Sequence, residues 1–277
     1  MRIFVAVSII LALSLLALGA TLYRAPHQAV VHQDGKATPP KGSRTPVVVE
    51  LFTSEGCSSC PPADALLAQL DAQQPVAAAE VIALEQHVDY WNQLGWVDPF
   101  SSPERTRRQQ EYAETFGNDS VDTPQMVVDG AVEFVGSREG QARQVIAEAA
   151  SRGKTPVQLT AGQNGAGPGK LLLTAHVPKL ANAPSNDSVE VFLAITESRL
   201  HSDVTRGENA GKALDHAGVV RELKRIGVAG AKTDPAFSGT ETITLVSGWK
   251  RENLRAVLFL QEKRSRRVIG AASIPLI

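Results

Sequence analysis

The chain has 277 residues, of which 43% are hydrophobic and 21% are charged, and its formal net charge is -1. This balance gives no reason to expect nucleic acid or an anionic membrane surface as a partner. With 2 cysteines, the chain is neither a disulfide-stapled miniprotein nor a four-cysteine zinc protein. Its length suits one or two domains with ordinary hydrophobic cores.

An apolar segment follows the basic start of the chain. Ile3 to Ala20 contains no charged residue and ends in small residues, which is typical of a secretory signal. We expect residues 1–20 to be a signal peptide cleaved after Ala20, and the protein to be exported to the periplasm or secreted. The alternative is an uncleaved inner-membrane anchor, because about 18 apolar residues are the lower limit of a membrane span. Residues 21–44 contain Pro and Gly without apolar periodicity and are predicted to be a linker.

Strand and helix patterns alternate over the next hundred residues. Helices are expected to begin at Pro61, near Ser102 and at Glu139, where proline or a polar residue precedes good helix formers. Buried strands are expected at 46–52 and 81–88, and a hairpin is expected around Asp129-Gly130, with arms at 125–128 and 132–135. This order predicts an α/β domain over residues 45–153.

The character of the sequence changes after residue 153. Short apolar or alternating runs are separated by clusters of Gly, Pro and Asn, with few helix signals. This pattern predicts an all-β, sandwich-like domain over residues 154–277. The expected strands are 157–161, 170–177, 188–197, 241–246, 254–262 and 267–274.

The cysteines form a C-x-x-C motif, Cys57-Ser58-Ser59-Cys60, between a predicted strand and a predicted helix. At a helix N-terminus, free N–H groups and the positive end of the dipole lower the pKa of the leading thiol. Because the thiolate attacks in disulfide exchange, Cys57 is the expected nucleophile and Cys60 the resolving thiol.

Other roles for the two cysteines remain open. A structural disulfide closing so short a loop would stabilise little. The thiolates could instead bind Cu(I) together with His87, which lies on the neighbouring predicted strand. A third alternative is a scaffold in which the pair is inert. The redox interpretation, which we favour, requires no metal and no cofactor.

The motif and a later segment together resemble thioredoxin-like folds. Those folds place a C-x-x-C after the first core strand and, opposite it, a cis-proline at the start of a hairpin strand. Thr123-Pro124-Gln125, followed by the Asp129-Gly130 hairpin, is similar to that second half. The resemblance implies that Pro124 is a cis-proline and that Thr123 presents its backbone to an extended chain bound beside the cysteines. It also implies an α/β thioredoxin-like fold for the N-terminal domain.

A more specific resemblance covers nearly the whole chain after residue 45. Several runs are similar to the uncharacterised secreted thioredoxin-like family called domain of unknown function 1223. This resemblance implies a fold and an exported location, and it brings no established substrate. The runs are 50–64, 87–92, 94–100, 123–125 and 206–211, with His216 and Val219 to Arg221 beyond them.

Several polar and aromatic residues are candidates for the site. The buried aspartate of thioredoxin has no counterpart in register, so Glu50, one residue further back, is the candidate proton acceptor for Cys60 if a bulge re-aims it. Its alternative is a structural carboxylate at a strand end. His87 and Asp89 share a strand face and are a candidate acid–base pair. Trp91 and Trp96 are either walls of a substrate groove or core residues.

The sequence therefore predicts an exported thiol–disulfide oxidoreductase. Cys57, Cys60, Thr123, Pro124 and Glu50 are its expected catalytic residues. Its expected partners are thiols or disulfides of proteins or small molecules, and neither nucleic acid nor, after cleavage of the signal, a membrane is among them. The alternative function is a periplasmic module that binds Cu(I) or a partner through the same cysteines without redox turnover.

Overall fold

The computed structural model describes residues 44–162, 169–180 and 186–276. The predicted signal peptide, and the predicted linker apart from its last residue, lie outside this range. Of the helices that are described, none combines the length and apolarity needed to cross a membrane.

The elements up to residue 153 form close to where the sequence patterns place them. Two helices begin with proline, which the first turn tolerates because its N–H groups have no helical partner. The strands are β1 (Thr45–Thr53), β2 (Ala79–His87), β3 (Gln125–Val128) and β4 (Val132–Val135), and the helices are α1 (Pro61–Gln73), α2 (Pro103–Phe116) and α3 (Glu139–Ala150).

In the rest of the described chain the regular elements are strands, apart from a short 3-10 helix at Arg251–Asn253. Three of its strands, β8, β9 and β10, are not among those that the sequence pattern indicates. The strands are β5 (Gln158–Gly162), β6 (Lys170–Val177), β7 (Val189–Glu197), β8 (Leu200–Asp203), β9 (Ala213–His216), β10 (Val219–Ala229), β11 (Phe237–Thr244), β12 (Leu254–Glu262) and β13 (Val268–Pro275).

One mixed sheet of eight strands joins the two halves of the chain, in the order β13-β12-β7-β10-β2-β1-β3-β4. Its two halves meet where β2 pairs in parallel with the start of β10, at Glu85 and Val219. The expectation of an α/β thioredoxin-like domain followed by a separate sandwich is therefore wrong. The described structure is mostly β, with this large sheet and two smaller ones, β11-β6-β5 and β8-β9.

The error has a physical cause in β10. Its sequence, VVRELKRIGVA, has two buried valines at the start and then a run of exposed or half-buried residues rich in charge. It matches neither the alternation of a half-buried strand nor the apolar run of a buried one. Because β10 is the strand that pairs with both β2 and β7, overlooking it hides the connection between the halves.

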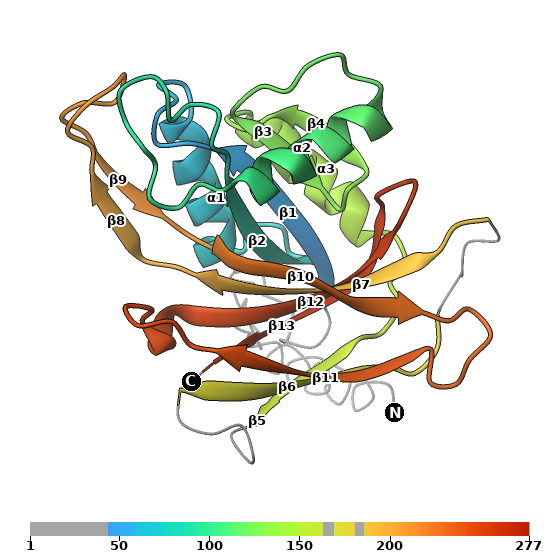
Figure 1. Ribbon diagram of the computed structural model, residues 1–277. Coiled ribbons are helices and arrows are strands. Elements are labelled where there is room, and N and C mark those ends of the chain that lie inside the picture. The colour runs from blue at the N-terminus through green and yellow to red at the C-terminus, as the bar shows by residue number, and fades with distance from the viewer. Residues whose placement is uncertain (1–43, 163–168, 181–185, 277) are drawn as a thin grey trace, which may run out of the picture. The chain divides into compact units, whose positions relative to one another are not determined.

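The large sheet has apolar residues on both faces. Val47, Val49 and Leu51 of β1 pack against α1 and α3, while the strands of the second half pack on β5, β6 and β11. Figure 1 shows the three helices and the β5-β6-β11 sheet on opposite sides of β7, β10 and β12. The opposite face of β1 and β2 shares a third core with β7, β12 and β13. The sheet curls around this core, so that β13 contacts β1.

The β3–β4 turn connects the first half to the C-terminal hairpin. Asp129 and Gly130 both have positive φ, 49° and 63°, which an Asp-Gly hairpin turn requires. The Asp129 carboxylate accepts hydrogen bonds from the Val48 N–H at 3.0 Å and from Lys154 Nζ at 2.6 Å. The Asp129 carbonyl accepts one from the N–H of Val268 at 2.7 Å. The turn therefore anchors the curl of the sheet.

Substitution of Gly130 tests this anchor. A Cβ at this position would lie 1.9 Å from the carbonyl oxygen of Arg266, so Gly130→Ala requires the backbone to move. We expect it to lower the free energy of unfolding by about 2–4 kcal/mol, measured by urea denaturation. The control is Gly140→Ala, where a Cβ meets no atom within 4 Å and stability should change by less than about 1 kcal/mol. Equal stability of the two variants would contradict the close approach.

Candidate functional site

Cys57 and Cys60 form a disulfide at the start of α1. Cys60 is the N-cap residue of the helix, and its carbonyl accepts a hydrogen bond from the Asp64 N–H at 3.1 Å. Neither cysteine has exposed surface, whereas Ser58 and Ser59 between them are exposed. The oxidised pair therefore lies just beneath the surface, covered by its own loop.

The expected proline lies against this loop. The Thr123–Pro124 peptide bond is cis, which confirms what the resemblance implies. The Thr123 carbonyl oxygen lies 3.8 Å from Cys57 Sγ and accepts a hydrogen bond from Ser59 Oγ at 3.4 Å. The structure thus brings Cys57, Thr123 and Pro124 together.

An open groove begins at the same place. Ser59, Thr123 and Pro124 line one part of it, and Phe134 and Val135 of β4 line another. Its volume is about 930 Å³. β4 is the last strand of the large sheet, so the groove runs along a sheet edge that ends beside the disulfide loop.

The second half of the chain holds the disulfide loop from the other side. Asn209 Nδ2 donates hydrogen bonds to the carbonyls of Glu55 at 2.8 Å and Cys57 at 2.9 Å. The Ser58 N–H donates to Glu208 Oε2 at 3.2 Å. We call these contacts of Glu208 and Asn209 the loop clamp. The family resemblance includes 206–211, but nothing in the local sequence shows that this segment contacts residues so far away in the chain.

The two tryptophans also contact the loop and its surroundings. Trp91 Nε1 donates a hydrogen bond to Thr123 Oγ1 at 2.8 Å, and Trp96 Nε1 donates one to Glu55 Oε2 at 2.7 Å. Both indoles are half-buried. Trp91 also packs against the buried cluster of Phe52, Val88 and Tyr112. Both tryptophans thus hydrogen-bond to residues around the disulfide, and Trp91 contributes to a core as well.

Glu50 is not directed toward the disulfide. The register of β1 with β2 and β3 is unbroken, so no bulge turns Glu50 around. Leu51 packs with α1, and adjacent residues of a strand point to opposite faces. Glu50 therefore faces away from the helix that carries Cys60, and the geometry does not support a role as its proton acceptor.

Glu50 is instead the centre of a buried ion pair. Its carboxylate accepts hydrogen bonds from Arg108, Tyr112 and Gln86. Burial alone would raise the pKa of Glu50. The positive charge of Arg108 and the hydrogen bonds from Arg108, Tyr112 and Gln86 instead hold that pKa below its ordinary value. The side chain is thus a fixed carboxylate within the core.

Asp64 of α1 is a buried acid that the sequence patterns do not single out. It follows Cys60 by four residues on α1, a spacing that places two side chains on one helix face. Asp64 is 5% exposed, and Thr53 Oγ1 donates a hydrogen bond to it at 2.6 Å. Burial, with repulsion from Glu85, raises the pKa of Asp64 to about 7. The spacing from Cys60 is the signal in the sequence that could have identified it.

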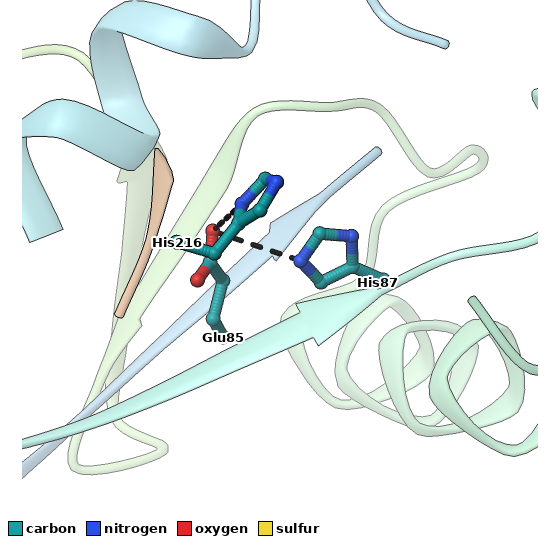
Figure 2. A group of neighbouring side chains, drawn as sticks. All are labelled: Glu85, His87 and His216. Carbon is teal, nitrogen blue, oxygen red and sulfur yellow. Dashed lines mark hydrogen bonds and ion pairs between the residues drawn. The ribbon is translucent and has the colours of Figure 1, made fainter. Parts of the chain in front are cut away.

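A second buried group lies at the end of β2. Figure 2 shows Glu85 and His87 with His216 of β9, and both imidazoles face the carboxylate. Glu85 Oε1 lies 3.0 Å from His216 Nδ1 and 3.7 Å from His87 Nε2. Burial would lower the pKa of His216, but the carboxylates of Glu85 and Glu55 raise it to about 9.

The candidate acid–base pair of His87 and Asp89 does not form. His87 Nδ1 lies 2.7 Å from Asp98 Oδ2, and Asp89 accepts a hydrogen bond from Thr106 Oγ1. Since the His87 ring is directed to Asp98 and Glu85 and both cysteines are oxidised, the structure gives no support to a Cu(I) site made of Cys57, Cys60 and His87.

Removal of Arg108 tests the buried ion pair. Arg108→Met leaves the Glu50 carboxylate buried without its cation and should cost about 3–5 kcal/mol of unfolding free energy. Glu50→Gln combined with Arg108→Met should recover part of that loss, measured by urea denaturation. Arg143→Met is the control, because its ion pair with Glu139 is exposed and should contribute less than about 1 kcal/mol. A similar small effect at both arginines would refute the structural role given to Glu50.

Comparisons with known proteins identify the family. The family model described as "Protein of unknown function (DUF1223)" matches residues 48–261 of the sequence. No curated protein matches the chain. The fold is similar to that of protein AGR_C_4864 from Agrobacterium tumefaciens, with 25% identity, a TM-score of 0.60, and 83% of this chain and 94% of that chain covered. It is also similar to HBP35 of Porphyromonas gingivalis, with 15% identity, a TM-score of 0.61, and 84% and 76% covered. Since the family model spans most of the chain, this protein belongs to the DUF1223 family.

Proposed function

We propose that this protein is an exported thiol–disulfide oxidoreductase whose redox-active pair is Cys57 and Cys60. One observation carries the proposal: an oxidised C-x-x-C at the start of a helix, with the carbonyl preceding a cis-proline against the Cys57 sulfur. The helix N-terminus stabilises a thiolate at Cys57 once the pair is reduced. The proposed export rests on the apolar segment between Ile3 and Ala20.

The oxidised pair accepts two electrons from a substrate dithiol. A substrate thiolate attacks Cys57 Sγ, the bond between Cys57 and Cys60 breaks, and Cys60 leaves as a thiolate that takes up a proton. The second substrate thiolate then attacks the substrate sulfur of the mixed disulfide. A substrate disulfide forms and Cys57 leaves as a thiolate. The same steps in reverse reduce a substrate disulfide.

Asp64 is the proposed proton donor and acceptor for Cys60, which is the role predicted from the sequence for Glu50. Its support is its position one helical turn after Cys60 and its burial. A carboxyl group with a pKa of about 7 can exchange a proton with a thiol near neutral pH. Protonated Asp64 neutralises the leaving Cys60 thiolate, and ionised Asp64 removes the proton for the reverse reaction.

The groove favours an extended polypeptide as the substrate. It runs from Ser59 and Thr123 along the edge strand β4. An extended chain can pair with a strand edge through its own backbone, which would bring a substrate cysteine to Cys57. Small thiols also fit this opening, but they would use little of the groove.

The reduction potential of the pair tests the proposal. Oxidised protein is equilibrated in glutathione buffers and the free thiols are trapped and counted. We expect a value of roughly -270 to -120 mV, the range of known oxidoreductases, whereas a value below about -300 mV would indicate a structural bridge. In Cys60→Ser, the free Cys57 thiolate attacks a substrate disulfide and releases one substrate thiolate, and the mixed disulfide at Cys57 should accumulate because no resolving thiol is present. Cys57→Ser, the matched variant, should not form it.

The loop clamp is expected to limit access to the disulfide. Asn209→Ala removes two hydrogen bonds to the loop, each worth about 0.5–1.5 kcal/mol, so opening becomes easier. We expect reduction of the disulfide by dithiothreitol to become roughly tenfold faster. The rate is measured from the appearance of free thiols. Asn118→Ala is the control, because this exposed asparagine lines the groove but contacts Glu133 instead of the loop. Equal rates for the two variants would show that the clamp does not control access.

A further inference from the structure

The buried group at the end of β2 has the geometry of a metal-binding site. One ligand atom each from Glu85, His87 and His216 lies within 4.8 Å of the others. Figure 2 shows the two ring nitrogens converging on one carboxylate oxygen. Glu85 and His87 are two residues apart on β2 and so share a face, and His216 enters from the end of β9.

The second nitrogen of each imidazole contacts another carboxylate. His87 Nδ1 lies 2.7 Å from Asp98 Oδ2, and His216 Nε2 lies 3.1 Å from Glu55 Oε1. Histidines that bind metals characteristically donate their other ring N–H to a carboxylate, which fixes the ring and makes the ligand nitrogen more basic. Both histidines of this group show that arrangement.

One ligand atom is left without a partner. His87 Nε2 is buried and makes no hydrogen bond within the described part of the chain. Glu85 Oε1, at 3.7 Å, is too far for a hydrogen bond. Buried polar atoms in native proteins nearly always have a partner. The nitrogen points into the space that His216 Nδ1 and Glu85 Oε1 also face.

We propose that Glu85, His87 and His216 bind one zinc ion. Two imidazoles and one carboxylate are an established ligand set for zinc, at distances of about 2.0–2.2 Å. The site has no sulfur ligand, which disfavours Cu(I), and its imidazoles disfavour Mg²⁺ and Ca²⁺, which prefer oxygen ligands. Asp98 and Glu55 would position the two rings. The site contains neither cysteine, and its ligands are inferred independently of the redox proposal.

An ion bound by Glu85, His87 and His216 would hold together residues that are far apart in the sequence. Two of its ligands are on β2 and the third is on β9, 131 residues away along the chain. Phe100 closes one side, with its ring 5.4 Å from each imidazole. An ion here would join the two halves of the chain beneath the loop that carries Cys57, because Glu55 belongs to that loop.

Zinc binding and X-ray absorption test the proposal. The oxidised full chain is stripped with a chelator, loaded with ZnCl₂ and dialysed against metal-free buffer. We expect one retained zinc per chain, with nitrogen and oxygen neighbours at about 2.0–2.1 Å, imidazole scattering, and no sulfur at about 2.3 Å. The double variant Cys57→Ser, Cys60→Ser should retain the same zinc. Absence of retained zinc, or a sulfur neighbour, overturns the proposal.

Matched variants locate the ion. His216→Ala should lose the retained zinc, and Asp98→Asn should bind it about 10- to 100-fold more weakly. His201→Ala is the control, because His201 lies 2.7 Å from Asp215 in a similar pair but is exposed. Circular dichroism checks that the variants fold. If His216→Ala is unfolded, the neighbours of zinc in the wild-type protein decide the question. A folded His216→Ala that keeps its zinc overturns the proposal.

Discussion

The short pairing between β2 and β10 is the constraint on which the rest of the structure depends. It is parallel and is confined to Glu85 and Val219, with the Glu85 N–H donating to the Gly218 carbonyl at 2.8 Å. Despite its small extent, it makes one sheet out of strands from both halves of the chain. It also fixes the position of β9, which precedes β10 directly, and so brings His216 to Glu85. The clamp residue Asn209 reaches the disulfide loop through the same arrangement.

A second constraint is that the charged groups placed in this interior must compensate one another. Removing an ion from water costs several kcal/mol unless it is paired and hydrogen-bonded. Glu50 meets this requirement through Arg108, whose guanidinium also donates to Gln261 of β12. Glu55, Glu85 and Asp98 meet it through His87 and His216. Gln261 joins the first set and His216 joins the second, so each set includes a residue from the second half of the chain.

The sequence predicts well those elements whose structure depends on neighbouring residues in the chain. Proline at a helix start, the Asp-Gly turn and apolar runs of β-branched residues place α1, α2, the β3–β4 hairpin and most strands to within a few residues. The C-x-x-C and the resemblance likewise locate the disulfide and the cis-proline. The predictions that are wrong or missing concern residues whose structure depends on contacts with distant parts of the sequence. The charged β10 is a strand because β7 and β2 pair with it, and Glu50 faces Arg108 because the β1 register has no bulge. Asn209 contacts Cys57 across 152 residues of sequence, and no local pattern encodes that contact.

The late position of β10 has a consequence for synthesis of the chain. When a ribosome has completed β1 to β4 and α1 to α3, β10 is not yet present to pair with the outer edge of β2. Asn209 is not yet present either, so the Cys57 carbonyl lacks its hydrogen bond. A bare strand edge is a template for pairing with other chains, and contacts between residues far apart in sequence form slowly. The nascent first half therefore depends on residues made later to cover its unpaired strand edge and its disulfide loop. A protein cut after residue 153 would keep its cysteines but lose both the strand that covers β2 and the clamp that covers the disulfide loop.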